Sequence, residues 1–200
     1  MEKESKGRDQ VVGEVFEYIG HDFVKSAQLL FEENIKEGGT GKYFSSIMLL
    51  ASLAVELLPK SLIAVNICLK RSSESLEDIR GAINRKLNCL GHNLDDIFCE
   101  VPELKRALKI ASIKRVNNKN NANFLIDEFR LKIGAPKEQK QIRIKNLEGA
   151  RYGVFAKNKD VGGVSTKDIK NVVDFLKKLS KETGRIRASM ITKFDENIKK

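Results

Sequence analysis

The sequence is poor in the residues that interrupt helices and in those that build metal or disulfide sites. Only three prolines and no tryptophan occur among its 200 residues. The apolar residues come in long stretches separated by polar clusters, which is typical of a helix bundle rather than a turn-dense β-sandwich. The sequence therefore predicts an all-α fold, an up-and-down bundle of about five to seven helices. A short irregular or extended segment is expected before a long C-terminal helix.

The few cysteines exclude the usual cysteine-based sites. The number of cysteines is odd, and they are Cys68, Cys89 and Cys99. They lie in apolar surroundings and form no CxxC pair or Cys/His spacing suited to tetrahedral zinc. We expect reduced thiols in the core, with neither a metal nor a cofactor. Residues 1–10 are charged and lack the apolar run of a signal peptide, so we expect a flexible tail on a cytoplasmic protein.

Apolar residues make up 41% of the chain, enough to bury one substantial core, so residues 1–200 are expected to form a single domain. The most apolar segment, Ile47 to Leu69, is long enough to raise the question of a membrane span. It carries Glu56 and Lys60 near its middle, each costing about 2.5 to 3.5 kcal/mol at a bilayer centre, and Pro59 between them. We interpret it as a buried central helix and expect no membrane contact.

Positive charge is concentrated toward the C-terminal end of a chain whose net charge is +10. Residues 130–200 hold 19 Lys/Arg against 8 Asp/Glu, whereas residues 1–129 hold 18 against 19. The excess of +11 in this C-terminal third favours contact with a polyanion, either nucleic acid or an acidic protein. The alternative is a solvated, lysine-rich surface that aids only solubility.

Apolar spacing and capping residues predict the helices of the first half. A three-and-four spacing predicts an amphipathic helix from Val11 to about Ile35, and a helix that is apolar on nearly all sides follows from about Tyr43 to Lys70. Ser75 and Asn93 are expected to cap the next two helices, and Pro102 to start another.

The signals between these helices and the last one are weaker. Five asparagines among nine residues predict an exposed loop from Arg115 to Asn123. We interpret Phe124–Ile133 as a short helix, and Lys137–Lys145 as charged and weakly ordered. Four glycines within Gly149–Gly163 predict a loop or a short extended piece laid on the bundle.

A last long helix is expected to begin at Ser165, whose capping partner is Asp168 three residues later. Its apolar face runs from Ile169 to Met190. The opposite side carries a basic stripe, which comprises Lys167, Lys170, Lys177, Lys178, Lys181 and Arg185.

The glycines around Gly41-Lys42 suggest a phosphate-binding loop, but the rest of the pattern is missing. The motif GxxxxGK[ST] needs glycine where Lys36 stands and Ser or Thr where Tyr43 stands, and it follows a strand rather than a helix. We therefore expect an ordinary turn at this position.

Three short stretches carry a family resemblance. Glu56-Leu57-Leu58-Pro59-Lys60-Ser61-Leu62 places Glu before Lys on the central helix, Gly91-His92-Asn93-Leu94 opens a later helix, and Ala150-Arg151-Tyr152 precedes the last one. In this order, between residues 10 and 190, they resemble the HEPN superfamily of helical bundles (higher eukaryotes and prokaryotes nucleotide-binding). Pro59 and Asn93 depart from the commoner residues of that family.

The resemblance implies a homodimer in a microbial stress or defence setting that binds RNA, a nucleotide or an acidic partner without catalysis. Many relatives are metal-independent ribonucleases or toxins with an Arg-x(4-6)-His motif, in which Arg steadies phosphate and His moves a proton. The one match is Arg85 to His92, so an endoribonuclease acting through this pair across two chains is an alternative. A protein-interaction module that never touches nucleic acid is another.

The residues of these stretches also have structural interpretations. A histidine in a turn before a helix, as His92 is, more often makes a structural hydrogen bond than a catalytic one. Glu56 and Lys60 are four residues apart and are predicted to form a half-buried ion pair that fixes helix register. Arg151 and Tyr152 are expected to anchor their loop to the bundle, or to stack on a base.

Overall fold

The computed structural model describes residues 19–119, 125–145 and 165–198. Six α-helices, a short 3-10 helix and three strands occur in this part of the chain. In chain order they are α2 (Ile19–Lys36), α3 (Phe44–Lys70), α4 (Leu76–Leu90), α5 (Leu94–Cys99), α6 (Pro102–Ala107), β1 (Ile110–Lys119), β2 (Leu125–Ile133), η2 (Pro136–Glu138), β3 (Lys140–Lys145) and α9 (Thr166–Ile198). The prediction of a mostly helical fold is confirmed. The fold is not all-α, however, since β1, β2 and β3 form a small antiparallel sheet.

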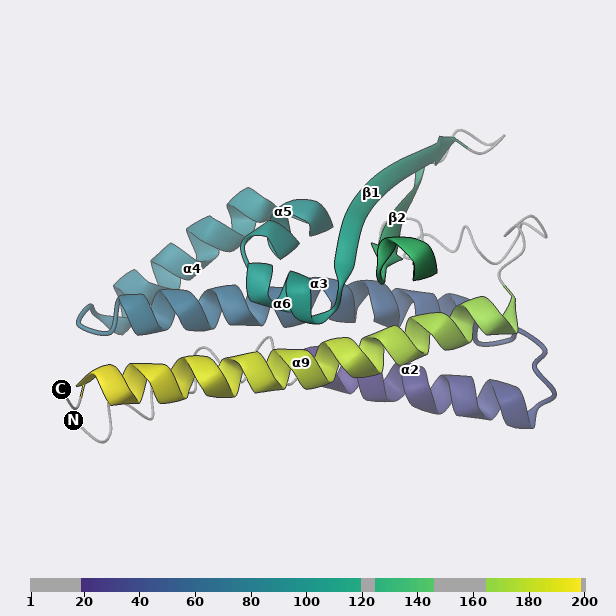
Figure 1. Ribbon diagram of the computed structural model, residues 1–200, viewed down its shortest axis with the longest axis horizontal. Coiled ribbons are helices and arrows are strands. Elements are labelled where there is room, and N and C mark those ends of the chain that lie inside the picture. The colour runs from purple at the N-terminus through teal and green to yellow at the C-terminus, as the bar shows by residue number, and fades with distance from the viewer. Residues whose placement is uncertain (1–18, 120–124, 146–164, 199–200) are drawn as a thin grey trace.

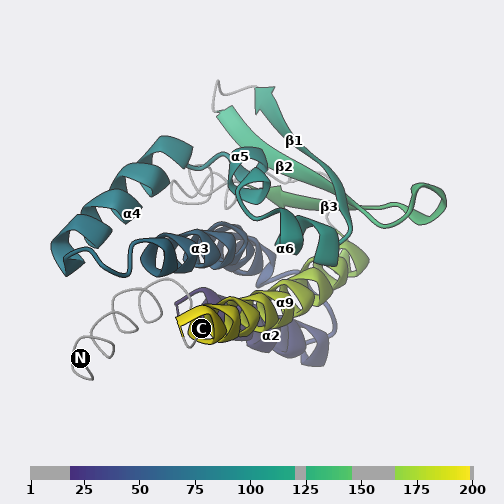
Figure 2. The same ribbon diagram turned by 60° about the vertical axis from the view of Figure 1, so that its left-hand side comes forward.

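The helices α2, α3 and α9 run side by side along the long axis of the molecule, and α4, α5, α6 and the sheet lie on the other side of α3 (Figures 1 and 2). The interpretation of the apolar central helix is confirmed, because Ala51, Val55 and Leu58 of α3 are fully buried. α3 is long and apolar enough to cross a membrane, yet 78% of its apolar window is buried inside the fold, as in the core helix of a soluble protein.

The capping predictions are confirmed. Ser75 Oγ accepts the backbone N–H of Asp78 at 3.2 Å, and α4 begins at the next residue. Asn93 Oδ1 accepts the N–H of Asp95 at 3.2 Å at the start of α5. At α9 the arrangement is reciprocal, because Ser165 N–H donates to the Asp168 carboxylate at 2.9 Å and Ser165 Oγ accepts the Asp168 N–H at 3.2 Å. Each side chain thus satisfies backbone donors that the helix itself leaves free.

The sheet replaces three predicted segments. The expected loop of residues 115–123 is wrong for residues 115–119, which belong to β1. The expected helix of residues 124–133 is also wrong, since residues 125–133 form the strand β2. Residues 120–124 lie outside the described residues. The segment of residues 137–145, expected to be weakly ordered, contains η2 and β3. The physical reason is strand pairing, since nine residues of β1 oppose residues of β2. The hydrogen bonds and side-chain contacts of this pairing outweigh the turn preference of asparagine. The expected loop of residues 149–163 and the tail of residues 1–10 lie outside the described residues.

Alternation of apolar and polar residues gives the sheet one buried face. Ile113, Leu131 and Ile142 oppose one another across the three strands and are all buried. Phe129 and Ile144 form the next buried pair. β1 contacts α5 and α6, whereas β3 contacts α3 and α9, so the sheet covers the helices from one side (Figure 2).

The cysteines differ from the prediction of core thiols. Cys68 of α3 is buried, but Cys89 and Cys99 are exposed. Cys89 is followed by the buried Leu90 and Cys99 is preceded by the buried Phe98, so each lies beside the apolar face of its helix rather than on it. Apolar neighbours in sequence therefore did not establish burial.

Gly20→Ala is expected to lower the free energy of unfolding by about 1 to 3 kcal/mol, although alanine favours helix over glycine by about 1 kcal/mol. A Cβ at Gly20 of α2 would lie 2.8 Å from Cδ2 of Leu58, a core side chain with no exposed area. Gly184→Ala in α9 is the matched control, since a Cβ there meets nothing within 4 Å. Urea unfolding should show this control gaining stability, and an equal gain at Gly20 would contradict the close packing.

Candidate functional site

Three polar residues meet at the middle of α3. Lys60 Nζ donates to Glu56 Oε1 at 2.7 Å, and the two side chains are only 9% and 10% exposed. The predicted ion pair is confirmed, and it is more buried than expected. His92 approaches the same carboxylate, with its Nδ1 at 3.0 Å from Oε1 and 2.9 Å from Oε2 of Glu56.

The contact with Glu56 sets the orientation of the His92 ring. An Nδ1–H that donates to a carboxylate leaves Nε2 as the unprotonated nitrogen of a neutral imidazole. The side chain is 67% exposed, so the ring can meet a molecule from solution. The same arrangement also has a structural effect, because it ties the turn before α5 to the central helix.

Arg85 does not join this cluster within one chain. It is exposed on α4, and its guanidinium folds back over Gly81, where a Cβ would lie 3.3 Å from an Arg85 Nη atom. This direction leads toward the start of α4, whereas His92 follows its end. Among the described residues no hydrogen bond or ion pair joins Arg85 to His92, so the predicted catalytic pair is not assembled in a single chain.

The basic stripe lies on the exposed side of α9, as predicted. Lys170 pairs with Asp174 at 2.6 Å, and Arg185 pairs with Glu182 at 2.8 Å. Lys177, Lys178 and Lys181 are exposed and make no ion pair with any residue of the described ranges. The other two predicted binding residues, Arg151 and Tyr152, lie outside the described residues.

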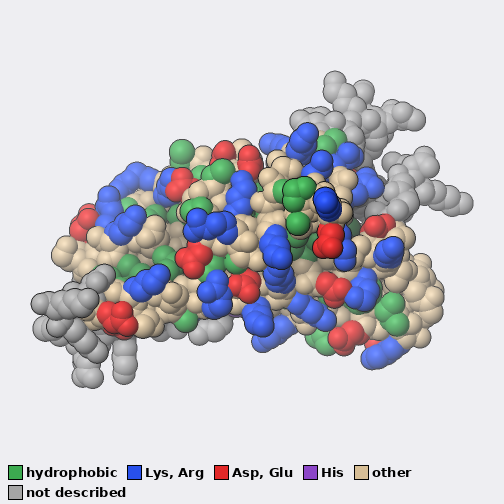
Figure 3. Space-filling view, in the orientation of Figure 1, with side chains coloured by type: hydrophobic (Ala, Val, Ile, Leu, Met, Phe, Trp, Pro, Cys, Tyr) green, Lys and Arg blue, Asp and Glu red, His purple; other side chains and the backbone are tan. Residues whose placement is uncertain are grey.

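The sheet carries more of the excess positive charge than α9 does. A basic surface was predicted on the last helix only, and this one was not predicted. Residues 110–145 hold nine Lys/Arg against three Asp/Glu, or +6, whereas Thr166–Ile198 holds eight against five, or +3. Residues 19–109 are balanced at twelve against twelve. Lys and Arg side chains lie along α9 and gather over the sheet end of the molecule on one face (Figure 3). Alternation of isoleucine with cations in Lys140–Lys145 is the signal that predicts such a strand.

A buried carboxylate organises the cations of the sheet. The Glu128 side chain is 2% exposed, and its Oε1 accepts hydrogen bonds from Arg130 Nε at 2.7 Å and Arg143 Nε at 2.9 Å. Its Oε2 accepts one from Arg143 Nη2 at 3.0 Å. Burial raises the pKa of the Glu128 carboxyl, but the hydrogen bonds and charges of Arg143 and Arg130 together lower it below its ordinary value of 4.5.

The Glu128 arrangement predicts a loss of stability in acid. The folded-state pKa lies below the unfolded value, so this contribution to the free energy of unfolding is fully present above pH 4.5. It is lost as the pH falls below 4.5 through the folded-state pKa. Urea unfolding from about pH 6 to about pH 3 should show the stability gap between wild type and Glu128→Gln shrinking with acidity. A gap that stays constant would show that Glu128 does not titrate as the structure requires.

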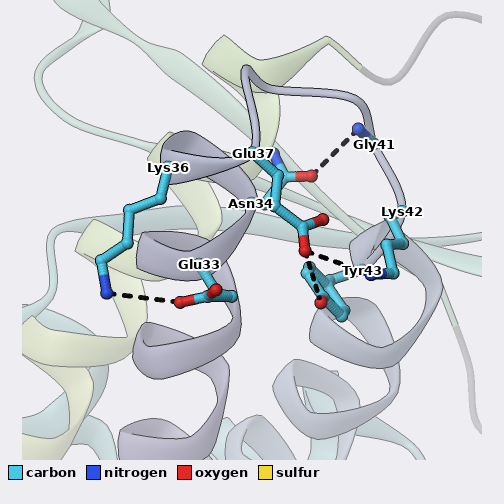
Figure 4. Close-up of polar contacts among 7 residues, drawn as sticks. All are labelled: Glu33, Asn34, Lys36, Glu37, Gly41, Lys42 and Tyr43. Atoms are coloured by element: carbon cyan, nitrogen blue, oxygen red, sulfur yellow. Dashed lines mark hydrogen bonds and ion pairs between the residues drawn. The ribbon is translucent and has the colours of Figure 1, made fainter.

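The loop between α2 and α3 is closed by its own contacts (Figure 4). Asn34 is fully buried, and its Oδ1 accepts the Gly41 N–H at 2.9 Å. Glu37 Oε1 accepts hydrogen bonds from Lys42 Nζ at 3.1 Å and Tyr43 Oη at 3.2 Å. The positive charge of Lys42 is therefore compensated by Glu37 within the loop. This pairing supports an ordinary turn rather than a phosphate-binding loop.

An open groove of about 290 Å³ lies between α3 and α4. Two of its cations are already paired, Arg71 with Glu74 at 2.9 Å and Lys86 with Glu100 at 2.7 Å. Its remaining lining is mostly aliphatic, and it contains no aromatic side chain on which a base could stack. The groove therefore does not favour a nucleotide as the ligand.

Comparison with known protein families, with curated proteins and with solved structures finds no match.

Proposed function

We propose that this chain is a HEPN-like helical protein that binds RNA without cleaving it. The observation that carries the proposal is the separation of charge, with residues 19–109 balanced and the sheet and α9 holding +6 and +3. A surface with an excess of positive charge attracts a polyanion, whose counterions are released on contact. The His92–Glu56 contact supports the HEPN resemblance, since it joins two of the stretches on which that resemblance rests.

An acidic protein partner is the less favoured ligand of this surface. The buried centre of a protein interface is rich in apolar and aromatic side chains. The large hydrophobic residues exposed in the described ranges are Ile19, Leu29 and Ile35, all on α2 rather than among the cations. α9, with 33 residues, extends for about 50 Å, a length suited to the repeating charges of a nucleic-acid backbone.

The test is fluorescence anisotropy of a labelled mixed-sequence RNA at several salt concentrations. Wild type should bind with an affinity that falls steeply with salt, and the triple variant Lys177→Ala/Lys178→Ala/Lys181→Ala should bind more weakly. The slope of log affinity against log salt should drop by about 2, since each phosphate contact on single-stranded RNA contributes about 0.7.

A charge-matched control is Lys25→Ala/Lys70→Ala/Arg80→Ala, which removes three exposed cations from α2, α3 and α4. It should leave the salt slope near that of wild type. No RNA binding at low salt, or an equal loss in both triple variants, would rule out the proposal.

The orientation of His92 favours a second candidate, a metal-independent endoribonuclease. With Nδ1 held by Glu56, the exposed ring can present Nε2 to a ribose 2′-hydroxyl and accept its proton as the 2′-oxygen attacks the adjacent phosphorus. The P–O5′ bond then breaks, and the leaving 5′-oxygen takes a proton from water, which leaves a 2′,3′-cyclic phosphate and a 5′-hydroxyl. Arg85 would steady that phosphate from a second chain, since the two residues do not meet within one. RNA fragmentation that is lost in both His92→Ala and Arg85→Ala would establish this function, whereas RNA left intact by wild type would exclude it.

A further inference from the structure

Three cations lie side by side across the sheet. Lys114 of β1 opposes Arg130 of β2, and Arg130 opposes Arg143 of β3. Their neighbours in sequence, such as Leu131 and Ile142, are buried, so the cations point to the other face of the sheet. We call Lys114, Arg130 and Arg143 the cation row. Residues directly opposite in antiparallel strands have Cβ atoms about 5 Å apart, so the row is a compact line of charge.

This arrangement is costly unless an anion compensates it, because like charges directly opposite one another destabilise a sheet. Glu128 compensates in part by binding Arg130 and Arg143 at 2.7 to 3.0 Å. Three cations against Glu128 leave an excess of two positive charges, which Asp168 near Arg143 reduces to one. Lys114 is exposed, and no ion pair joins it to any residue within the described ranges.

The hydrogen bonds to Glu128 use only part of each guanidinium. Arginine has five N–H donors, and Arg130 donates to Glu128 through Nε alone, which leaves both of its amino groups. Arg143 uses Nε and Nη2 and leaves Nη1. The two side chains are 36% and 44% exposed, while Glu128 beneath them is 2% exposed. Glu128 thus holds the guanidinium groups in place while their remaining donors stay within reach of solution.

The cation row adjoins the start of α9. Arg143, Glu128 and Asp168 line the same small cavity, together with Val172 of α9. The charge of Asp168 raises the pKa of Arg143, after the larger effect of the Glu128 hydrogen bond. The Asp168 carboxylate is held by the N–H and Oγ of Ser165 and so serves the helix cap. The row therefore lies at the end of α9 from which the basic stripe begins.

We infer that the cation row binds backbone phosphates of the RNA and that Glu128 is the positioning residue that preorganises its two arginines. The inference rests on the proposed RNA binding and extends its site from α9 to the sheet. Arg donors in a fixed fork suit phosphate oxygens, and a held side chain loses less freedom on binding. Such contacts fix the path of the strand over the protein and carry no base specificity.

The test is RNA anisotropy with Lys114→Ala, which leaves the Glu128 hydrogen bonds intact, and with Arg143→Lys, which keeps the charge but not the fork. Each should weaken RNA binding by about three- to tenfold. Lys114→Ala should also reduce the salt slope by about 0.7. Lys25→Ala on α2 removes the same charge from an exposed site and should stay within about twofold of wild type. Thermal unfolding of Lys114→Ala at or above the wild-type temperature would confirm that its effect is on binding, since removing a like charge opposite Arg130 should not destabilise the sheet.

The outcomes separate this inference from the proposed function. If both row variants bind RNA as wild type does, while the α9 triple variant binds it more weakly, the cation row is not part of the RNA site. The proposed RNA binding would still stand. Absence of RNA binding by wild type would overturn both. Inorganic phosphate that displaces RNA far better than chloride at equal ionic strength would identify a small anion as the ligand, which would also overturn the assignment to RNA.

Discussion

Glu56→Leu is expected to lower the free energy of unfolding by about 3 to 5 kcal/mol, measured by urea unfolding at neutral pH. The change leaves the Lys60 ammonium, which is 9% exposed, without its carboxylate in the interior of the bundle. A buried charge without a partner is among the most destabilising features a mutation can create. The His92 ring is 67% exposed and can turn to water, so its lost hydrogen bond adds little.

The double variant Glu56→Leu/Lys60→Met is the control for this prediction. It removes both charges and fills the space with apolar atoms, so it should recover most of the stability lost in the single variant. A double variant as unstable as Glu56→Leu would show that side-chain shape, rather than the stranded ammonium, causes the loss.

Phe98→Ala is expected to cost about 3 to 5 kcal/mol of unfolding free energy. Among the described residues Phe98 is the largest fully buried side chain. It belongs to α5, a helix of six residues that is too short to persist without tertiary contacts. Since α5 and α6 contact β1, amide hydrogen exchange in β1 should accelerate together with the fall in stability.

Cys99→Ala is the matched control for Phe98→Ala, because Cys99 is the next residue and is exposed. We expect it to change the free energy of unfolding by less than about 0.5 kcal/mol. If the β1 amides exchange hydrogen equally slowly in Phe98→Ala and in Cys99→Ala, α5 does not support the sheet.

Features that depend on residues close together in sequence were predictable. The caps at Ser75, Asn93 and Ser165 each join residues two or three apart, and the pair Glu56–Lys60 spans one helical turn. Such contacts follow from helix geometry alone, so apolar spacing and capping motifs suffice to place them. This is why α3, α4, α5 and α9 begin where the sequence predicts.

Features that need distant residues to meet were missed. His92 lies 36 residues from Glu56, and Arg143 lies 15 from Glu128, so no local pattern indicates either contact. The strand β1 was hidden by its asparagines, which favour turns in isolation but accept a ladder when β2 pairs with them. The cation row depends on that pairing and could not be seen without it.

The order of the elements along the chain governs how α3 is exposed during synthesis. The other long helix that packs on it, α9, begins about a hundred residues after α3 ends, which takes a ribosome about 5 to 20 s. Until then α2 alone among the long helices can cover α3, and the side of α3 that packs on α9 has no cover from that helix. The nascent chain therefore displays one side of a long hydrophobic helix until α9 has been synthesised.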